Sequence, residues 1–322
     1  MKSILTRRFF CGLLICAAPT LVAAQGYPNK PVTLVVPYAT GGVTDVAARL
    51  VAQRLSIALG APVIVENKGG AGTRIGAEAV ARALPDGYTL LFANSVTHGT
   101  LSAITKVLRF DPIKDFVPVA QLTWYATTVL CNLSLPANNI AELIALAKKN
   151  PGKVTHANAG PGSGSHFSGE LFSSMAGVNI LQVPYKGLGP AMVDVMAGVV
   201  NCTHEGSAKP YLDSGKVKAL ATTGLQRDPR FPDLPTVHEA GVKGYDMTWW
   251  QGIVAPAGTP PEIVTRLVQA VHTIANDAEF KAAAYNLGLN VKTGTPAELA
   301  KLIADDIRKY QKIAVDANLT VE

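Results

Sequence analysis

Residues 32–58 have the sequence VTLVVPYATGGVTDVAARLVAQRLSIA, and this stretch decides the fold of the 322-residue chain. The β-branched run at residues 32–36 is typical of a strand that is buried on both faces. After a glycine turn, apolar side chains recur at helical spacing from Val46 to Ala58, with polar side chains opposite, which indicates a helix packed on a sheet. A second strand is expected at residues 63–65. This order predicts an α/β sheet with parallel strands and right-handed crossovers.

Strand-like and helix-like segments continue to alternate through the chain. The chain is longer than most proteins that fold around a single hydrophobic core, so we expect two domains. Further strands are expected at residues 89–92, 128–130, 180–184, 199–203, 217–221 and 249–254. Helices are expected from Asn139, where Glu142 completes a capping box in outline, and from near Ser165, Pro190, Pro260 and Pro296. We predict two α/β lobes joined by hinge strands near 124 and 226. Residues 25–124 and 228–322 form a discontinuous lobe 1, and residues 125–227 form lobe 2.

Residues 1–24 have the features of an export signal. Lys2, Arg7 and Arg8 precede an apolar run, and small residues at 22–24 predict cleavage after Ala24. The paired arginines also fit the twin-arginine pattern, so Sec and twin-arginine export remain alternatives. No later stretch approaches the roughly 20 apolar residues of a membrane-spanning helix. We therefore expect a periplasmic protein that relies on a separate membrane partner for any transport.

The charge of the chain bears on its possible ligands, and its cysteines bear on whether it contains a disulfide. The chain has 29 basic and 23 acidic residues, and its basic residues do not form runs with interleaved aromatics, so nucleic-acid binding is not expected. Two cysteines, Cys131 and Cys202, follow the signal, and an oxidising compartment would permit them to pair. We favour buried free thiols, because a disulfide between neighbouring strands of one sheet strains the geometry.

Two glycine-containing turns are candidates for anion binding. The turn at residues 37–45 exposes backbone N–H groups at a helix start, where the helix dipole attracts a carboxylate. A similar turn at residues 160–166 adds the hydroxyls of Ser163 and Ser165, which can either donate to a carboxylate or cap the helix. If the turns face each other across a cleft, they suit a ligand with a carboxylate at one or both ends.

The sequence lacks the residue spacings that are typical of catalytic and metal sites. Ser165 and His166 are adjacent, but the G-x-S-x-G pattern of an exported α/β hydrolase is absent. The segment at residues 70–76 departs from dinucleotide-binding spacing, although Arg74 within it could supply a positive charge to an anion. The histidines lack metal-ligand spacing. We therefore expect no catalysis, cofactor or metal, and keep the hydrolase as the alternative.

Several motifs together resemble the tripartite tricarboxylate transporter receptor family, the Bug-type extracytoplasmic solute receptors. They are YPxKP at residues 27–31, the turn at 37–45, VEN at 65–67, PDGYTLL at 85–91, FDPxxDFxP at 110–118, VPYKG at 183–187 and APAGTP at 255–260. The resemblance implies a two-lobed periplasmic binding protein fold of type II that closes over an organic acid. It also implies a membrane permease as partner, or a sensor domain if the receptor is an orphan. We expect the receptor to be a monomer.

The family resemblance also implies a set of ligand-binding residues. The ligand-binding residues that the resemblance implies lie in three segments of this chain. The first turn contributes Tyr38, Gly41, Gly42, Thr44 and Asp45, and the end of the strand at 89–92 contributes Ser95 and Thr97. The second turn contributes Gly162, Ser163, Ser165 and His166. The chain departs from the family pattern at Arg74 and around Glu205, which we include as specificity residues. Arg74 favours a doubly anionic ligand, whereas Glu205 favours one that bears an amine or hydroxyl. The identity of the solute therefore stays open.

Overall fold

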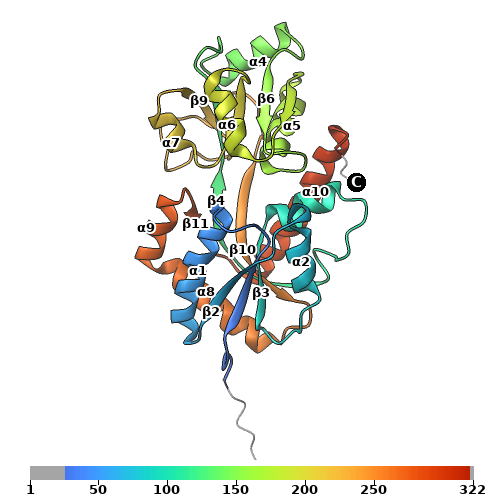
Figure 1. Ribbon diagram of the computed structural model, residues 1–322, viewed down its shortest axis with the longest axis vertical. Helices are drawn as coiled ribbons and strands as arrows, with labels where there is room; N and C mark the ends of the chain where they lie inside the picture. The colour runs from blue at the N-terminus through green and yellow to red at the C-terminus, as the bar shows by residue number, and fades with distance from the viewer. Residues whose placement is uncertain (1–25, 320–322) are drawn as a thin grey trace, which may run out of the picture.

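The computed structural model describes residues 26–319, so the predicted export signal and its cleavage site lie outside the described part. Figure 1 shows two lobes, each built on its own β-sheet and flanked by helices. Two long strands, β4 and β10, run between the lobes. The α/β, two-lobed architecture predicted from the sequence is confirmed. Across residues 26–319, every helix is too short or too polar to cross a membrane.

Lobe 1 is built on a six-stranded sheet with the order β11-β4-β10-β3-β1-β2. Its strands are β1 Val32–Val36, β2 Val63–Asn67, β3 Thr89–Asn94, β4 Phe116–Ala126, β10 Thr248–Pro256 and β11 Asn290–Val291. As predicted, β1 pairs in parallel with β2, and it also pairs in parallel with β3. β10 pairs antiparallel with β3 and β4. A strand from the C-terminal part of the chain therefore lies in the middle of a sheet that begins near the N-terminus.

Helices cover both faces of the lobe 1 sheet. They are α1 Val43–Leu59, α2 Arg74–Ala81, α3 Leu101–Ile104, α8 Pro261–Asn276, α9 Ala278–Asn286 and α10 Pro296–Asp316, with short helical turns η1 Ala71–Thr73 and η2 Val96–Thr100. Successive side chains of a strand point to opposite faces. Leu34 accordingly packs in a cluster with α1 and α8, whereas Val35 packs in one with α2 and α10. Burial on both faces explains the nearly continuous apolar sequence of β1.

Lobe 2 is built on a five-stranded sheet with the order β7-β6-β8-β5-β9. Its elements are β5 Thr128–Asn132, α4 Ile140–Lys149, β6 Thr155–Asn158, α5 Gly164–Ala176, β7 Leu181–Pro184, α6 Leu188–Ala197, β8 Cys202–Glu205, α7 Ala208–Asp213 and β9 Val217–Thr222. The side chain of Asn139 accepts a hydrogen bond from the N–H of Glu142 at 2.9 Å. The predicted cap at the start of α4 is therefore confirmed.

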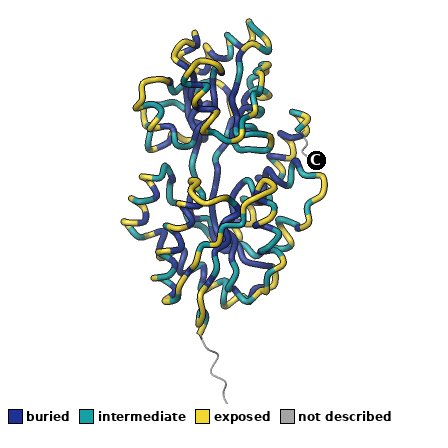
Figure 2. Tube along the Cα trace, in the orientation of Figure 1, coloured by how far each residue is buried: buried dark blue, intermediate teal, exposed yellow. Residues whose placement is uncertain are grey.

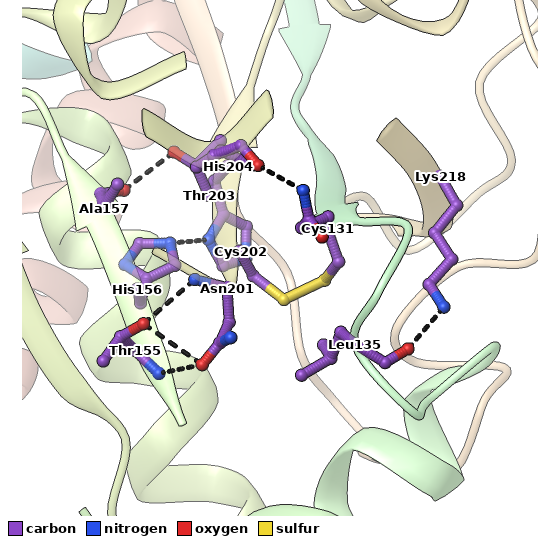
Figure 3. The surroundings of a disulfide bond; sticks show 12 residues. Cys131, Leu135, Thr155, His156, Ala157, Asn201, Cys202, Thr203, His204 and Lys218 are labelled. Atoms are coloured by element: carbon purple, nitrogen blue, oxygen red, sulfur yellow. Dashed lines mark hydrogen bonds between the residues drawn. A yellow bond between two sulfur atoms is a disulfide. The ribbon is translucent and has the colours of Figure 1, made fainter. Parts of the chain in front are cut away.

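Cys131 and Cys202 form a disulfide, so the prediction of free thiols is wrong (Figure 3). The two residues are register partners on the antiparallel strands β5 and β8. The next residues, Asn132 and Asn201, form a backbone hydrogen bond, which makes the cysteines a non-hydrogen-bonded pair. Side chains approach most closely at such pairs, and the Cα atoms here are 4.0 Å apart. The strand register therefore places the two sulfur atoms within bonding distance.

The segment between β9 and β10 packs on lobe 2. Val237, Val242 and Met247 belong to the same apolar cluster as residues of β5 and α4. The hydroxyl of Thr223 donates to the carbonyl of Met247 at 2.8 Å. Figure 2 shows a buried interior in each lobe, with the connecting strands between them. The division at residues 125–227 stays a prediction, and this packing favours a return to lobe 1 near residue 247.

Candidate functional site

A cavity of about 170 Å³ lies between the lobes, beside the connecting strands. Lobe 2 contributes loops at the start of α5 and the end of β8, and lobe 1 contributes Val43 and residues 287–289. Its walls are formed by Val43, Tyr125, Thr127, Ala159, Ser163, Gly164, Ser165, Leu188, His204, Glu205, Gly206, Ser207, Trp249, Leu287, Gly288 and Leu289. The site is complete only when both lobes are folded.

A larger groove lies on the opposite face of the connecting strands. Because neighbouring strand residues point to opposite faces, Tyr125 and Trp249 line the cavity whereas Trp124 and Trp250 line the groove. The groove has a volume of about 710 Å³. The predicted ligand-binding residues that contact either space are all at the smaller cavity. We therefore take the smaller cavity as the candidate ligand site.

The start of α5 presents hydrogen-bond donors to the cavity. Ser163 caps the helix, because its Oγ accepts from the N–H of His166 at 3.3 Å. The hydroxyl of Ser165 accepts from the N–H of Ala159 at 2.9 Å, which fixes the loop against the helix. Within residues 26–319, the N–H groups of Gly164 and Ser165 have no acceptor. Two backbone donors at the positive end of the helix dipole therefore remain for a ligand.

Trp249 adds a third donor beside this helix start. The residue is only 3% exposed, and its indole N–H has no hydrogen-bond partner among the described residues. A Cβ placed on Gly164 would lie 2.9 Å from Cζ2 and 3.2 Å from Cε2 of the indole ring. The indole nitrogen is bonded to that Cε2 atom, so its N–H lies close to the start of α5. A buried donor without an acceptor is unfavourable, which makes this N–H a candidate contact for a ligand atom.

Tyr310 holds the indole in place from the other side. The rings of Trp249 and Tyr310 are stacked, with centroids 5.8 Å apart and an interplanar angle of 15°. Tyr310 belongs to α10, and its ring also meets Phe167 of α5 edge-on at 5.4 Å. The C-terminal helix of lobe 1 therefore packs against lobe 2 and fixes a side chain of the cavity wall.

Glu205 is the carboxylic acid of the cavity lining. It is 7% exposed, and its Oε1 accepts from the N–H of Ser207 at 2.8 Å. Burial raises the pKa of Glu205, although the N–H groups of Ser207 and Gly206 act in the opposite direction. A carboxylate can accept about four hydrogen bonds, so further acceptor capacity is available to a ligand.

His204, which also lines the cavity, is part of a buried chain of hydrogen bonds. Gln182 Oε1 lies 2.8 Å from Nδ1 of His156 and also accepts from the side-chain N–H of Asn158. His156 Nδ1 therefore carries the proton, and its Nε2 accepts from His204 Nδ1 at 2.7 Å. Burial lowers the pKa of both histidines, that of His156 to about 4. The pair contributes no charge to the cavity near neutral pH.

The predicted first-lobe turn lies at the lobe 1 edge of the cavity, where Val43 is the residue that lines it. Asp45 is buried and maintains the turn, since it accepts from Arg49, from Asn67 and from the N–H of Gly41 at 2.9 Å. Burial alone would raise the pKa of Asp45, but these hydrogen bonds outweigh it and lower the pKa. Gly41 and Gly42 are exposed and Thr44 is half-buried.

The remaining predicted residues of lobe 1 lie outside the cavity lining. The hydroxyl of Tyr38 accepts from Asn94 at 3.0 Å, and burial raises its pKa to about 12. Ser95 accepts from the backbone N–H of Trp250, which joins η2 to β10. Thr97 is fully buried and bonds to the backbone of Asn94. Arg74 is half-buried at the start of α2.

In the second-lobe turn, His166 faces its own loop. Its Nδ1 accepts from the N–H of Gly162 at 3.2 Å, and its Nε2 lies 3.6 Å from Glu170. Ser163, Ser165 and Glu205 are the predicted residues that line the cavity, and their roles in binding stay predictions. No sequence pattern pointed to residues 287–289, which follow α9, or to Tyr125 as cavity residues.

Comparison with known proteins places these features in one family. The profile of the tripartite tricarboxylate transporter family receptor matches residues 47–319. An R. palustris protein solved with adipate is 35% identical, with a TM-score of 0.81, over 91% of this chain and 99% of that one. The periplasmic binding protein BugD is 37% identical, with a TM-score of 0.78, over 92% and 100% of the two chains.

A third solved structure is similar to this chain over both lobes. MatC from Rhodopseudomonas palustris, with bound malate, is 36% identical, with a TM-score of 0.77, over 89% of this chain and 99% of that one. The match extends across both lobes and includes the elements that form the cavity. The chain has the periplasmic binding protein fold and belongs to the tripartite tricarboxylate transporter receptor family.

Proposed function

We propose that this protein is a periplasmic receptor that binds a small carboxylate solute in the inter-lobe cavity and presents it to a tripartite tricarboxylate-type permease. The observation that carries the proposal is a helix start at the cavity where the N–H groups of Gly164 and Ser165 have no acceptor, with the unpaired indole N–H of Trp249 close to it. Unpaired donors at a helix N-terminus favour an anion. The relatives solved with adipate and malate support the same ligand class.

The first-lobe turn is the proposed second contact. Gly42 caps α1 without a side-chain hydrogen bond, so the first N–H groups of that helix are open to a ligand. Val43 at this helix start already borders the cavity. A ligand held by both helix starts favours a closed arrangement of the lobes, because only that arrangement makes both sets of contacts. Closure would then be the signal that the permease recognises.

The same geometry argues against the alternative, an exported hydrolase. Ser165 and His166 are adjacent in sequence, but the hydroxyl of Ser165 is bonded to the N–H of Ala159 and Nδ1 of His166 is bonded to the N–H of Gly162. A nucleophile needs a base within hydrogen-bond reach. We expect no turnover of an ester or amide panel; product in excess of the protein, abolished by Ser165→Ala, would support the hydrolase instead.

Isothermal titration calorimetry with a panel of mono- and dicarboxylates tests the receptor proposal. Trp249→Phe removes the indole donor and should weaken the best ligand about 10-fold to 100-fold, since a hydrogen bond to a charged group contributes about 1.5–3 kcal/mol. The matched control is Trp124→Phe, which changes an indole on the opposite face of the connecting strands. Equal affinities for both variants and the wild type would contradict the proposed wall.

A further inference from the structure

The cavity has an unusual charge for a site that receives an anion. Glu205 is the one carboxylic acid in its lining, and the lining contains neither Lys nor Arg. His204 is neutral, because burial lowers its pKa well below the ordinary value. Once an anion occupies the start of α5, the lining offers no side-chain cation for a second one.

The guanidinium of Arg230, which contacts the lining residue Gly206, does not add a free positive charge to the cavity. Arg230 pairs with the fully buried Asp228 at 2.6 Å and donates to the carbonyls of Gly206 and Ala126 at 3.0 and 3.2 Å. Its charge is therefore matched by Asp228, and its donors are used within the protein. It orients the loop that follows Glu205 without supplying a free positive charge to the cavity.

The space between the donor wall and Glu205 is mainly apolar. Val43, Leu188, Leu287 and Leu289 line it together with the rings at the connecting strands. Apolar walls favour a hydrocarbon body in the ligand. A buried carboxylate favours a hydrogen-bond donor opposite it, because an acceptor or a second negative charge could not donate to the acceptor capacity that Ser207 leaves free on Glu205.

We infer that the solute is a monocarboxylate with a hydrocarbon body whose second polar group is a hydrogen-bond donor, an amine or a hydroxyl, and that Glu205 is the acceptor that selects it. The inference rests on the proposed function and narrows its ligand class. The carboxylate end lies at the start of α5, where the start of α1 reaches it on closure, and the donor end lies at the end of β8. Dicarboxylates are disfavoured, in contrast to the adipate and malate with which two relatives were solved.

Titration calorimetry of the mature protein with two matched ligand sets tests the inference. The first set is hexanoate, 6-aminohexanoate, 6-hydroxyhexanoate and adipate, and the second is the four-carbon series that ends in succinate. Within a set only the terminal group changes. We expect the amino or hydroxy acid to bind at least about 10-fold more tightly than both the plain acid and the diacid, the difference that one charge-assisted hydrogen bond gives.

Glu205→Gln removes the negative charge while keeping the side-chain shape, and should reduce the preference for the amine about 10-fold or more and improve diacid binding. Glu78→Gln, at an ion pair with Arg82 outside the cavity, is the matched control and should leave the ranking unchanged. Tightest binding of the diacid by the wild type overturns the inference even if the variant does not fold. Failure of every acid to bind overturns the proposed function as well.

Discussion

Acidification from pH 7 to pH 5 should strongly destabilise the fold through three buried histidines. Burial lowers the pKa of His98 to about 3 and that of His156 to about 4, and it also lowers the pKa of His204 well below its ordinary value. In the unfolded chain each histidine has a pKa of about 6.5. The unfolded state therefore binds more protons between pH 4 and 6.5, so stability falls as the pH falls through that window.

The magnitude follows from proton linkage. A histidine that stays neutral in the folded state loses about 2 kcal/mol of stability between pH 7 and pH 5, so three lose about 6 kcal/mol together. Glu205 and Asp246 act in the opposite sense, because burial raises their pKa values and their contribution to stability is lost as the pH rises. They make the net loss smaller. A loss of this size is a large part of the stability of a typical domain.

Urea unfolding at pH 7 and pH 5, followed by fluorescence and circular dichroism, measures the effect. The variant His98→Phe removes one titrating group from an aromatic environment, where the histidine ring is 4.9 Å from Phe116. It should reduce the pH dependence by about 2 kcal/mol. A difference of less than about 1 kcal/mol between the two pH values in the wild type would refute the argument that these histidines are buried in neutral form.

Three further variants test separate parts of the structure. Replacing Cys131 and Cys202 with alanine should lower the free energy of unfolding by about 4 kcal/mol, because a separation of 71 residues sets the loop entropy that the disulfide removes; an unchanged urea midpoint would contradict this. Gly164→Ala should weaken the best ligand about 10-fold by displacing the indole of Trp249, and calorimetry that shows equal affinity would exclude this contact. Asn139→Ala should lower stability by about 1 kcal/mol through loss of the α4 cap and leave ligand affinity unchanged, which thermal unfolding and calorimetry check together.

The fold could be predicted because its signals are local. The apolar run of β1 and the helical spacing of α1 predict a parallel sheet, and the prediction agrees with the pairing of β1 with β2. The cap at Asn139 likewise depends on residues three positions apart. The disulfide depends instead on the register between β5 and β8, which joins residues 71 positions apart and is set by the packing of the whole lobe.

The residues of the cavity were only partly predictable, because some of them come together only through contacts between distant parts of the chain. Ser163 and Ser165 belong to a glycine-containing turn that sequence alone identifies. Trp249 both lines the cavity and stacks on Tyr310, and no local sequence pattern assigns it either role. Residues 287–289 reach the cavity only because α9 ends beside the connecting strands. No local pattern in the sequence carries that information.

The position of β10 in the lobe 1 sheet has a consequence for the order in which the protein is made. The chain is synthesised from its N-terminus, so β3 and β4 emerge long before residues 248–256, which lie between them in the sheet. All five strands of lobe 2 come earlier, so that sheet can be completed first. The lobe that begins the chain is therefore the last to be finished. A nascent chain that stops before β10 would expose two unpaired strand edges, which favour aggregation.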